Sequence, residues 1–351
     1  MAGKSAWDKM DATMKIQVRE ISATDTAWDE LAASSRQNCL FVSRGFLDLW
    51  AGEDPSLRLL KLGCYDESNR LVCGQAIIHR KIMGVRVQNI LSTFYAGTPV
   101  LAGDIEENSP EQYEILSALA RESRKRFPYM RIEFHPNLTD ARAYLDNGWE
   151  ATPIYTHSWK LEDMQEVRKG MHRKERYIRK AQEMFDLGRE RGQEIIKDFL
   201  RLYAETMKKF DWQPTSKWRE AFLRKMKWLE SRDLLHIYTC RKKTGELVGI
   251  TLSLLSRENQ TAYFWLIGYD HTIDSKEFPP AIYYYASEDL SSEFKFIDFG
   301  EGAHASLYAF KDSLGTTSTP FWILKTENNS GWSLLHSRLR KIRQFLLKFV
   351  P

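Results

Sequence analysis

The sequence predicts an α+β protein made of two tandem, related units, each a mixed, mostly antiparallel sheet flanked by helices. Three observations predict this. The 351 residues, 43 % of them hydrophobic and 13 % aromatic, are enough for a large core. Runs of β-branched and aromatic residues bounded by turn formers occur in two groups of three. The segments that follow each group come in the same order, which indicates an internal repeat.

The first repeat is predicted to open with two helices and a three-strand meander. The helices are "TAWDELAAS" and "VSRGFLDLWAG", and the strands are "LRLLKLGCY", "RLVCGQAIIHRKI" and "MGVRVQNILSTFY". A helix, a strand, a helix and a last strand follow: "SPEQYEILSALARESRKRF", "YMRIEFHP", "NLTDARAYLDNGWE" and "ATPIYTHSWKL". Helical apolar spacing and strand alternation distinguish the two kinds of segment.

The second repeat has the same order. Its meander is "LLHIYTCR", "ELVGITLSLLS" and "TAYFWLIGY", followed by "PPAIYYYASEDLSSEF", "FKFIDFGE", "HASLYAFKDSLGT" and "TSTPFWILK". In both repeats the second of the later helices is predicted to run for about two turns and to end at a glycine, Gly148 or Gly315.

A helical segment from about Glu166 to Arg232 joins the repeats. It begins with a basic helix, "EVRKGMHRKERYIRKAQEMFDL", and the helices "EIIKDFLRLYAETMKKF" and "SKWREAFLRKMKWLESR" are predicted to open the second unit. The predicted organisation is a tag or variable extension at 1–13, a first unit at 14–162, the helical connection with a second unit at 163–330, and a basic C-terminal helix at 331–351.

Charge and cysteine content exclude several classes. The net charge of +4 is mild, but residues 168–180 carry seven Lys or Arg against one Glu, a pattern that attracts phosphates or anionic surfaces when it is not simply a solvated face. No apolar run is long enough to span a membrane and no signal peptide begins the chain, which favours a cytoplasmic protein, with peripheral membrane contact through the basic segments left open. The four cysteines form no CxxC pair, so neither a zinc site nor a redox dithiol is predicted.

The order of elements resembles the GNAT acyltransferase fold, and two such units in one chain resemble the Fem family of peptidyltransferases. The stretches that carry the resemblance span about Lys15 to Lys325: "FVSRGFLDLW", "YAGTPVL", "NGWEATPIYTHSWKLED", "RKERYIRKAQE", "FIDFGEG" and "FKDSLG". The resemblance implies an aminoacyltransferase that forms an amide bond between an aminoacyl group carried by tRNA and an amine acceptor. The acceptor is a peptidoglycan precursor, a peptide or a small molecule.

Other members of this double-GNAT group are predicted to use acyl-CoA, so an acyl-CoA-dependent N-acyltransferase of polysaccharide or natural-product assembly is the alternative. Acyl-CoA enzymes of this fold hold the pyrophosphate on a Gly-rich loop that opens a helix. Here no glycine lies between Asp270 and Ala286, which favours aminoacyl-tRNA as the co-substrate, with no tightly bound cofactor or metal. A third hypothesis is a non-catalytic GNAT-like scaffold that binds nucleic acid or an anionic surface.

The candidate catalytic residues lie in the strand "FKFIDFGE" of the second repeat and in the loop and helix that follow it. The resemblance implies that Lys311, the lysine of "F-K-x-x-x-G", is an electrostatic clamp for a phosphate or for the oxyanion. The first repeat has Tyr144 at the equivalent position. His304 and Glu301 are candidate general bases, and Asp298 ends a strand where it could orient the acceptor amine. Surface exposure, helix capping and structural pairing are the competing interpretations.

The candidate substrate-binding residues are aromatic or basic. The aromatic ones are predicted to line an acceptor cleft or to stack on a base, although strand aromatics belong more often to a core. The basic ones recur about every three residues and so share a helix face that could hold a tRNA or nucleotide-sugar phosphate. The set is Tyr95, Arg176, Arg179, Lys180, Tyr263, Trp265, Tyr283 and Tyr308.

Overall fold

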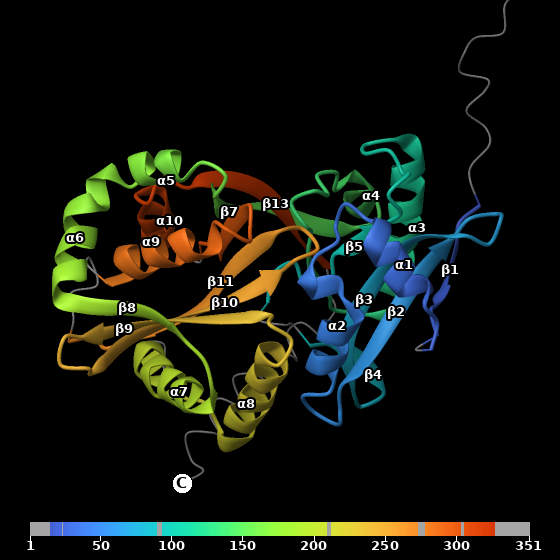
Figure 1. Cartoon of the computed structure of the whole chain (residues 1–351). Coiled ribbons are helices and arrows are strands. Elements are labelled where there is room, and N and C mark those ends of the chain that lie inside the picture. Colours follow the sequence, from blue (N-terminus) through green and yellow to red (C-terminus); the bar gives the residue numbers. More distant parts are fainter. Residues whose placement is uncertain are drawn as a thin grey trace, which may run out of the picture. The chain divides into compact units, whose positions relative to one another are not determined.

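The computed structural model describes residues 15–22, 24–89, 93–208, 212–272, 278–302 and 305–326 (Figure 1). The chain divides into two compact units. One contains the residues up to Pro153 together with those from Phe321 onward, and the other contains Ile154–Pro320. The division falls inside two strands, β7 and β13, so each of them belongs partly to each unit. The predicted extension at 1–13 and the predicted helix at 331–351 lie outside the described residues.

The first unit contains a five-stranded sheet in which β1, β2, β3 and β4 are neighbours in that order and β5 pairs with β3. A further strand, β6, pairs with the end of β13 through Ile323 and Glu133. The elements are β1 Gln17–Glu20, α1 Ala27–Ser34, a 3₁₀ turn Leu40–Val42, α2 Arg44–Ala51, β2 Arg58–Tyr65, β3 Leu71–Ile82, β4 Val85–Gln88, β5 Pro99–Leu101, α3 Pro110–Arg126, β6 Arg131–Glu133, α4 Arg142–Leu145 and β7 Trp149–Lys160.

Helices cover both faces of this sheet because side chains alternate along each strand. On β2, the Cys64 sulfur reaches the carbonyl of Ile115 in α3, whereas Lys61, on the opposite face, lies 5.3 Å from the ring of Trp28 in α1. The core between sheet and α3 is mainly apolar, with Leu62, Cys64 and Ile115 each completely buried. The amphipathic pattern of the α3 sequence thus produces the packing that it predicts.

The second unit contains a sheet in the order β7, β12, β11, β10, β9, β8, antiparallel except for the β11–β12 pair. Figure 1 shows α7 and α8 on one face of this sheet and α9 and α10 on the other. The elements are α5 Met164–Gly170, a 3₁₀ turn His172–Lys174, α6 Glu175–Met184, β8 Phe185–Glu190, α7 Gln193–Met207, α8 Ser216–Glu230, β9 Leu235–Lys242, β10 Leu247–Ser256, β11 Thr261–Tyr269, α9 Phe278–Leu290, β12 Phe296–Glu301, α10 Ala305–Asp312 and β13 Thr317–Thr326.

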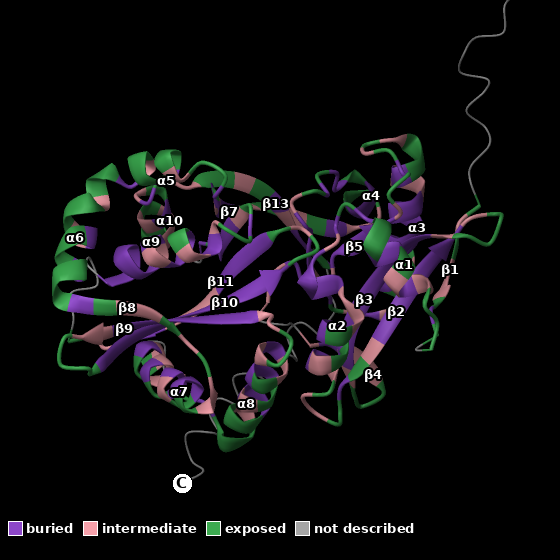
Figure 2. Ribbon diagram, in the orientation of Figure 1, coloured by how far each residue is buried: buried purple, intermediate pink, exposed green. Residues whose placement is uncertain are grey.

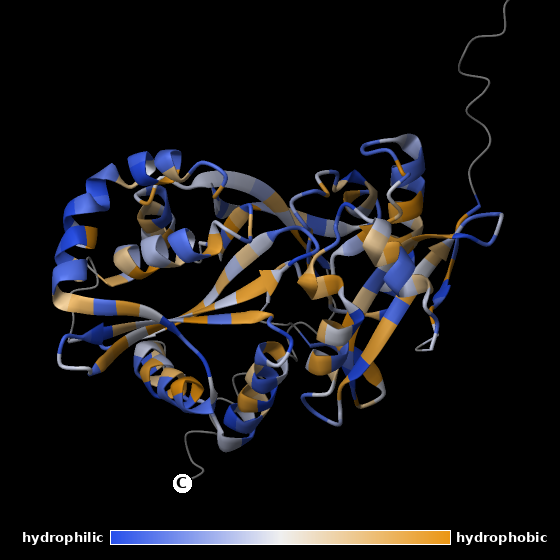
Figure 3. Cartoon of the chain, in the orientation of Figure 1, coloured by the Kyte–Doolittle hydropathy of each residue, from blue (hydrophilic) through white to orange (hydrophobic). Residues whose placement is uncertain are grey.

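The central strands of the second unit are buried on both faces. Every residue of β10 is buried, as Figure 2 shows. Figure 3 shows the matching contrast in hydropathy, with apolar stretches along β9 and β10 and a mainly hydrophilic α6. Gly268 lets α7 pack closely on β11, because a Cβ at this position would lie 2.8 Å from the backbone nitrogen of Tyr203 in α7. Among the described helices, none combines the length and apolar content that a membrane crossing requires.

The structure confirms the predicted α+β class and the tandem arrangement of sheets flanked by helices, and it corrects three elements. The basic segment predicted as one helix is divided into α5, a 3₁₀ turn and α6, and its end, Phe185–Glu190, is the edge strand β8. The third strand of the first meander is only Val85–Gln88, and α4 has a single turn. Gly148 and Gly315 have φ of +73° and +71°, so both end their helices in the left-handed conformation that glycine adopts without strain.

Candidate functional site

Strands β11 and β12 diverge in the second unit. They pair in parallel only from Thr261 and Phe296 to Tyr263 and Asp298, although β11 continues to Tyr269 and β12 to Glu301. In the described residues the two strands make no further pairs beyond this point. Two parallel strands that separate present backbone N–H and C=O groups to whatever enters between them. The separated ends of β11 and β12 are therefore the candidate site, and the residues predicted from "FIDFGEG" and "FKDSLG" lie beside it.

Lys311 is the most buried residue of α10 and holds the end of β12. It is 5 % exposed, and its Nζ donates hydrogen bonds to the carbonyls of Phe299, Gly300 and Glu301 at 2.7, 2.8 and 2.7 Å. Burial lowers the pKa of Lys311 to about 8, while the carboxylates of Asp298 and Glu301 act in the opposite direction. An ammonium has three hydrogens, and these three carbonyls accept all of them.

The contacts of Lys311 answer one of the competing interpretations: it is not a surface lysine. A direct contact with a phosphate or an oxyanion stays a prediction, because the structure pairs the ammonium with the protein's own carbonyls. What the ammonium does here is fix β12 where its pairing with β7 is irregular, between Asp298 and Glu301. Its positive charge still contributes to the local field, because Lys311 itself is largely removed from solvent.

Asp298 is part of the same hydrogen-bond chain. Its Oδ1 accepts a hydrogen bond from the hydroxyl of Thr156 and another, at 2.7 Å, from the N–H of Gly300. Thr156 and Asp298 are both buried. The predicted role in orienting an acceptor amine stays a prediction; the role that these contacts support directly is to hold the turn of backbone at Gly300, whose φ is +70°.

His157 and Asp312 complete the cluster and were not singled out from the sequence. His157 is 1 % exposed, and its Nε2 lies 3.3 Å from Asp312 Oδ1. Burial lowers the pKa of His157, and the nearby charge of Lys311 lowers it further. Among the described residues its Nδ1 has no hydrogen-bond partner. A neutral imidazole with one free acceptor atom is therefore the form that this environment favours.

The structure describes one of the two candidate bases, Glu301, but not the other, His304. Glu301 is the exposed last residue of β12, beside the opening. His304 lies outside the described residues. Tyr308, on α10, is half-buried with its ring 5.4 Å from that of His157, and a Cβ on Gly302 would lie 2.8 Å from the Tyr308 ring. Tyr308 therefore packs against the loop that joins β12 to α10.

The other aromatic candidates of the second unit contact different neighbours. Tyr263 is 1 % exposed and its hydroxyl accepts a hydrogen bond from Asn259 at 2.8 Å. Trp265 is half-buried, 6.0 Å from the ring of Phe222. Tyr283 is half-buried and stacks on Phe264, which lies in β11 just beyond its pairing with β12. Tyr263 is the last β11 residue paired with β12, Trp265 lies in the separated end of β11, and Tyr283 reaches that end through Phe264. Burial raises the pKa of Tyr283.

The remaining candidates lie elsewhere. Tyr95, in the first unit, is 3 % exposed with a φ of +52°, and its ring lies 4.9 Å from that of His135. Arg176, Arg179 and Lys180 are exposed on α6, whose Ile178 and Ala181 are buried. The prediction of a shared basic helix face fits this pattern of exposure. Their part in binding a phosphate stays a prediction.

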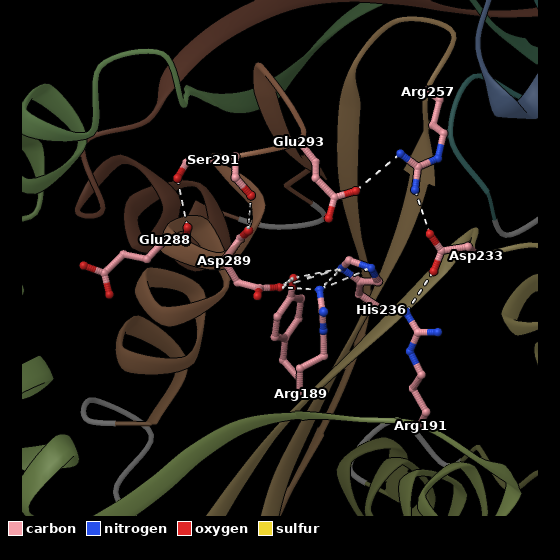
Figure 4. A network of polar contacts seen from close by, with 11 residues as sticks. Arg189, Arg191, Asp233, His236, Arg257, Glu288, Asp289, Ser291 and Glu293 are labelled. Atoms are coloured by element: carbon pink, nitrogen blue, oxygen red, sulfur yellow. Dashed lines mark hydrogen bonds and ion pairs between the residues drawn. The ribbon is translucent and has the colours of Figure 1, made fainter.

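A second polar network in this unit involves none of the predicted site residues (Figure 4). Asp289 of α9 accepts hydrogen bonds at 2.9 Å from Arg189 of β8 and from Tyr238 of β9. His236, 2 % exposed, lies beside them with its pKa lowered by burial and then by Arg189. A connected set of ion pairs joins Arg191, Asp233, Arg257 and Glu293. These contacts fasten the edge strand to the helix and the strand ends, which is a structural role.

The part of the chain that the structure describes offers no set of ligands for a metal ion. There is no group of three or more His, Cys, Asp or Glu side chains placed to bind a metal ion. The residues that precede α9, where an acyl-CoA enzyme would hold a pyrophosphate, begin at position 273 and lie outside the described residues.

Comparisons with known proteins agree with this architecture. Residues 165–312 match the family model described as the acetyltransferase (GNAT) domain, and no protein with a curated description matches the chain. Among solved structures, FemX is similar with a TM-score of 0.61 and 11 % identity over 87 % of this chain and 96 % of FemX. A tandem GNAT protein from the clavulanic acid biosynthesis pathway gives 0.55 and 12 % over 89 % and 98 %. L-PGS from Bacillus licheniformis gives 0.52 and 13 % over 86 % and 92 %. Residues 165–312 are therefore similar to a GNAT acetyltransferase domain, and the chain as a whole shares its fold with FemX and with the tandem GNAT protein.

Proposed function

We propose that this chain is an N-acyltransferase that transfers an aminoacyl group from aminoacyl-tRNA to an amine, with the transfer taking place between the separated ends of β11 and β12. The observation that carries the proposal is the divergence of these strands beside the β12 end that Lys311 holds. The GNAT domain model over residues 165–312 supports the reaction class, and the likeness in fold to FemX supports the aminoacyl donor.

The proposed reaction forms one bond and breaks one. The lone pair of the acceptor nitrogen forms a C–N bond at the ester carbonyl, the carbonyl oxygen becomes an oxyanion, and the C–O bond to the tRNA ribose then breaks. One amine proton is removed by a base and one proton ends on the leaving oxygen. Glu301, exposed at the end of β12, is the described candidate for the base. The positive charge of Lys311 favours the oxyanion through its field.

An acyl-CoA donor is the second candidate, and it has its own support. The tandem GNAT protein of the clavulanic acid pathway is described as a form without AcCoA, and the matching family model is an acetyltransferase domain. The same opening would then admit a thioester, and a thiolate would leave in place of the ribose oxygen. The acceptor in either case is an amine of a peptidoglycan precursor, a peptide or a small molecule. The third candidate remains a non-catalytic scaffold.

The test offers both donors to the purified full chain in parallel, as labelled aminoacyl-tRNA and labelled acetyl-CoA with a panel of amine acceptors. The proposal expects label in an amide from aminoacyl-tRNA alone. Transfer from acetyl-CoA alone would refute the donor, and transfer from neither, with tRNA binding unaltered in Lys311→Ala, would favour the scaffold.

A matched pair of variants tests the base. Glu301→Gln keeps the size of the side chain and removes its basicity, whereas Glu220→Gln makes the same change on the exposed face of α8. Loss of a positioned general base lowers turnover by about 10²–10⁴-fold. Turnover in Glu301→Gln equal to that in Glu220→Gln would remove Glu301 from the mechanism and leave the donor assignment untouched.

A further inference from the structure

Three basic side chains of α3 border a pocket of about 590 Å³ on the first unit. Two come from arginines and one from a lysine, and the only carboxylate in the lining already accepts a hydrogen bond at 2.8 Å from the Tyr113 hydroxyl. The pocket therefore carries an excess of positive charge. Its lining residues are Arg121, Arg124, Lys125, Asp146, Asn147 and Gly148.

One wall of the pocket is fixed by a close contact between a guanidinium and a glycine. The Nη1 of Arg124 donates a hydrogen bond to the carbonyl of Asn147 at 2.9 Å. A Cβ placed on Gly148 would lie 2.2 Å from the same Nη1, so only a glycine lets the guanidinium lie against the chain here. Because the guanidinium is rigid and planar, this contact also fixes the directions of its other N–H groups.

The other two cations have no partner to explain them. In the described part of the chain neither Arg121 nor Lys125 has an ion pair or a side-chain hydrogen bond, and both are exposed. They lie four residues apart on one helix face, and like charges at this spacing destabilise a helix. The helix dipole favours cations in the last turn, which accounts for Arg124 and Lys125, but Arg121 lies before that turn.

The internal repeat supplies a comparison within the same molecule. Phe127 and Gly148 correspond to Phe294 and Gly315, both 167 residues later. The backbone agrees with this alignment, since the N–H of Phe127 bonds to the carbonyl of Ser123 and that of Phe294 to the carbonyl of Leu290, both at 2.9 Å.

At this offset the three basic positions of the first unit become Glu288, Ser291 and Ser292 in the second. Glu288 and Ser291 lie at the end of α9 in Figure 4. The same fold is therefore built with one acidic and two neutral side chains at these positions. The fold does not require the cations, and the helix dipole leaves Arg121 unaccounted for, so the cluster of three on α3 calls for another explanation.

We infer that this pocket binds a phosphate-bearing group, a phosphomonoester or a diphosphate. Arginine offers a planar fork that matches phosphate oxygens and lysine adds a mobile point charge, which is the combination present here. The pocket lies at the C-terminal end of α3, in the unit that does not contain the separated ends of β11 and β12, and the inference does not depend on acyl transfer. The phosphate can come from a soluble molecule or from a lipid headgroup.

The test measures binding by the full chain and by two double variants. Arg121→Ser with Lys125→Ser replaces both cations by small neutral side chains, as the second repeat has at the position of Lys125, and breaks no ion pair or hydrogen bond in the described structure. Arg224→Ser with Lys227→Ser removes two exposed cations from α8 as a control. The probes are inorganic pyrophosphate, followed by calorimetry, and vesicles containing phosphatidylglycerol, followed by cosedimentation. Circular dichroism checks that both variants fold.

We expect the α3 double variant to bind at least tenfold more weakly than the wild type, and the α8 double variant to stay within twofold. Pyrophosphate binding that is lost in the α3 variant supports a soluble phosphate ligand, and vesicle binding alone that is lost in it supports a lipid headgroup. Equal loss in both double variants, no binding of either probe, or binding of only a single-stranded RNA added as a third probe would overturn the inference.

Discussion

Replacing Lys311 by methionine tests whether its ammonium mainly stabilises β12. The substitution keeps an unbranched side chain of similar length and removes the donor of three hydrogen bonds. Three carbonyls, those of Phe299, Gly300 and Glu301, then lose their partner. A buried group left without a partner destabilises the fold by about 1–3 kcal/mol.

The opposing effect is the burial of a charge. The pKa of Lys311 falls from 10.5 to about 8 on folding, which corresponds to about 3 kcal/mol of destabilisation at pH 7 that the methionine variant avoids. The loss of three hydrogen-bond partners, each taken at the middle of the range of about 1–3 kcal/mol, outweighs this gain in stability. We expect Lys311→Met to lower the free energy of unfolding by about 3 kcal/mol at pH 7.

The difference in stability between the wild type and Lys311→Met depends on pH. The unfolded lysine binds its proton up to about pH 10.5 and the folded one only up to about pH 8, so between these values the unfolded state binds more protons. The wild type therefore gains stability relative to the variant as the pH rises through this window. The gap between the two should widen from pH 7 to pH 10.

Urea unfolding followed by circular dichroism and tryptophan fluorescence at pH 7 and pH 10 measures both quantities, with each unit's transition fitted separately. Lys325→Met, an exposed position on β13, is the control and should change stability by less than about 0.5 kcal/mol. A loss below about 1 kcal/mol in Lys311→Met at pH 7, together with a gap that stays constant with pH, would refute the structural role.

Three further substitutions give measurable outcomes. Gly315→Ala should destabilise the chain by more than the 1–2 kcal/mol of left-handed strain that Gly245→Ala costs, because the new Cβ would lie 2.5 Å from the Cα of Gly170 whereas Gly245 has no atom within 4 Å; equal losses in urea unfolding would contradict this. Burial lowers the pKa of His135 to about 4, so wild-type stability should fall as the pH drops from about 6.5 to 4, and His135→Asn should flatten that slope; an unchanged slope would show that other groups cause it. Asp289→Ala removes the carboxylate that accepts two hydrogen bonds in Figure 4 and should lower the melting temperature by several degrees, and a shift under one degree would count against the network as a fastening.

Strands and helices with a strong pattern were predictable, and a charged edge strand was not. The fully buried β10 has a continuous apolar sequence, which the spacing of the chain reveals directly. The strand β8, Phe185–Glu190, instead has one buried residue, Phe185, among exposed and half-buried ones, and includes a glycine. It is a strand because it pairs with β9 from Phe185 to Glu190, and such long-range pairing leaves no local signal next to a basic helix.

The candidate site was predictable through Lys311 but not through the groups that surround it. The lysine lies in a recognisable "F-K-x-x-x-G" pattern, whereas its acceptors are main-chain carbonyls, which every residue has. The strand that contains His157 has a sequence like that of its counterpart in the other repeat, so the sequence does not single out the histidine. Its burial next to Asp312 arises only in the folded chain. When a side chain binds main-chain groups, the sequence therefore identifies the side chain but not the groups that it binds.

The division of the chain places a constraint on its synthesis. Strand β6 finds its partner in Ile323–Lys325, and the N–H of Met130 bonds to the Thr326 hydroxyl across a separation of 196 residues. Leu324 is completely buried in the core that Leu62 and Ile115 form. The first unit to leave the ribosome is thus the one that waits for the last described residues to complete it, and closing so long a loop slows this step. A nascent chain released near residue 320 would lack that final strand, so we expect it to expose the β6 edge to chaperones and proteases.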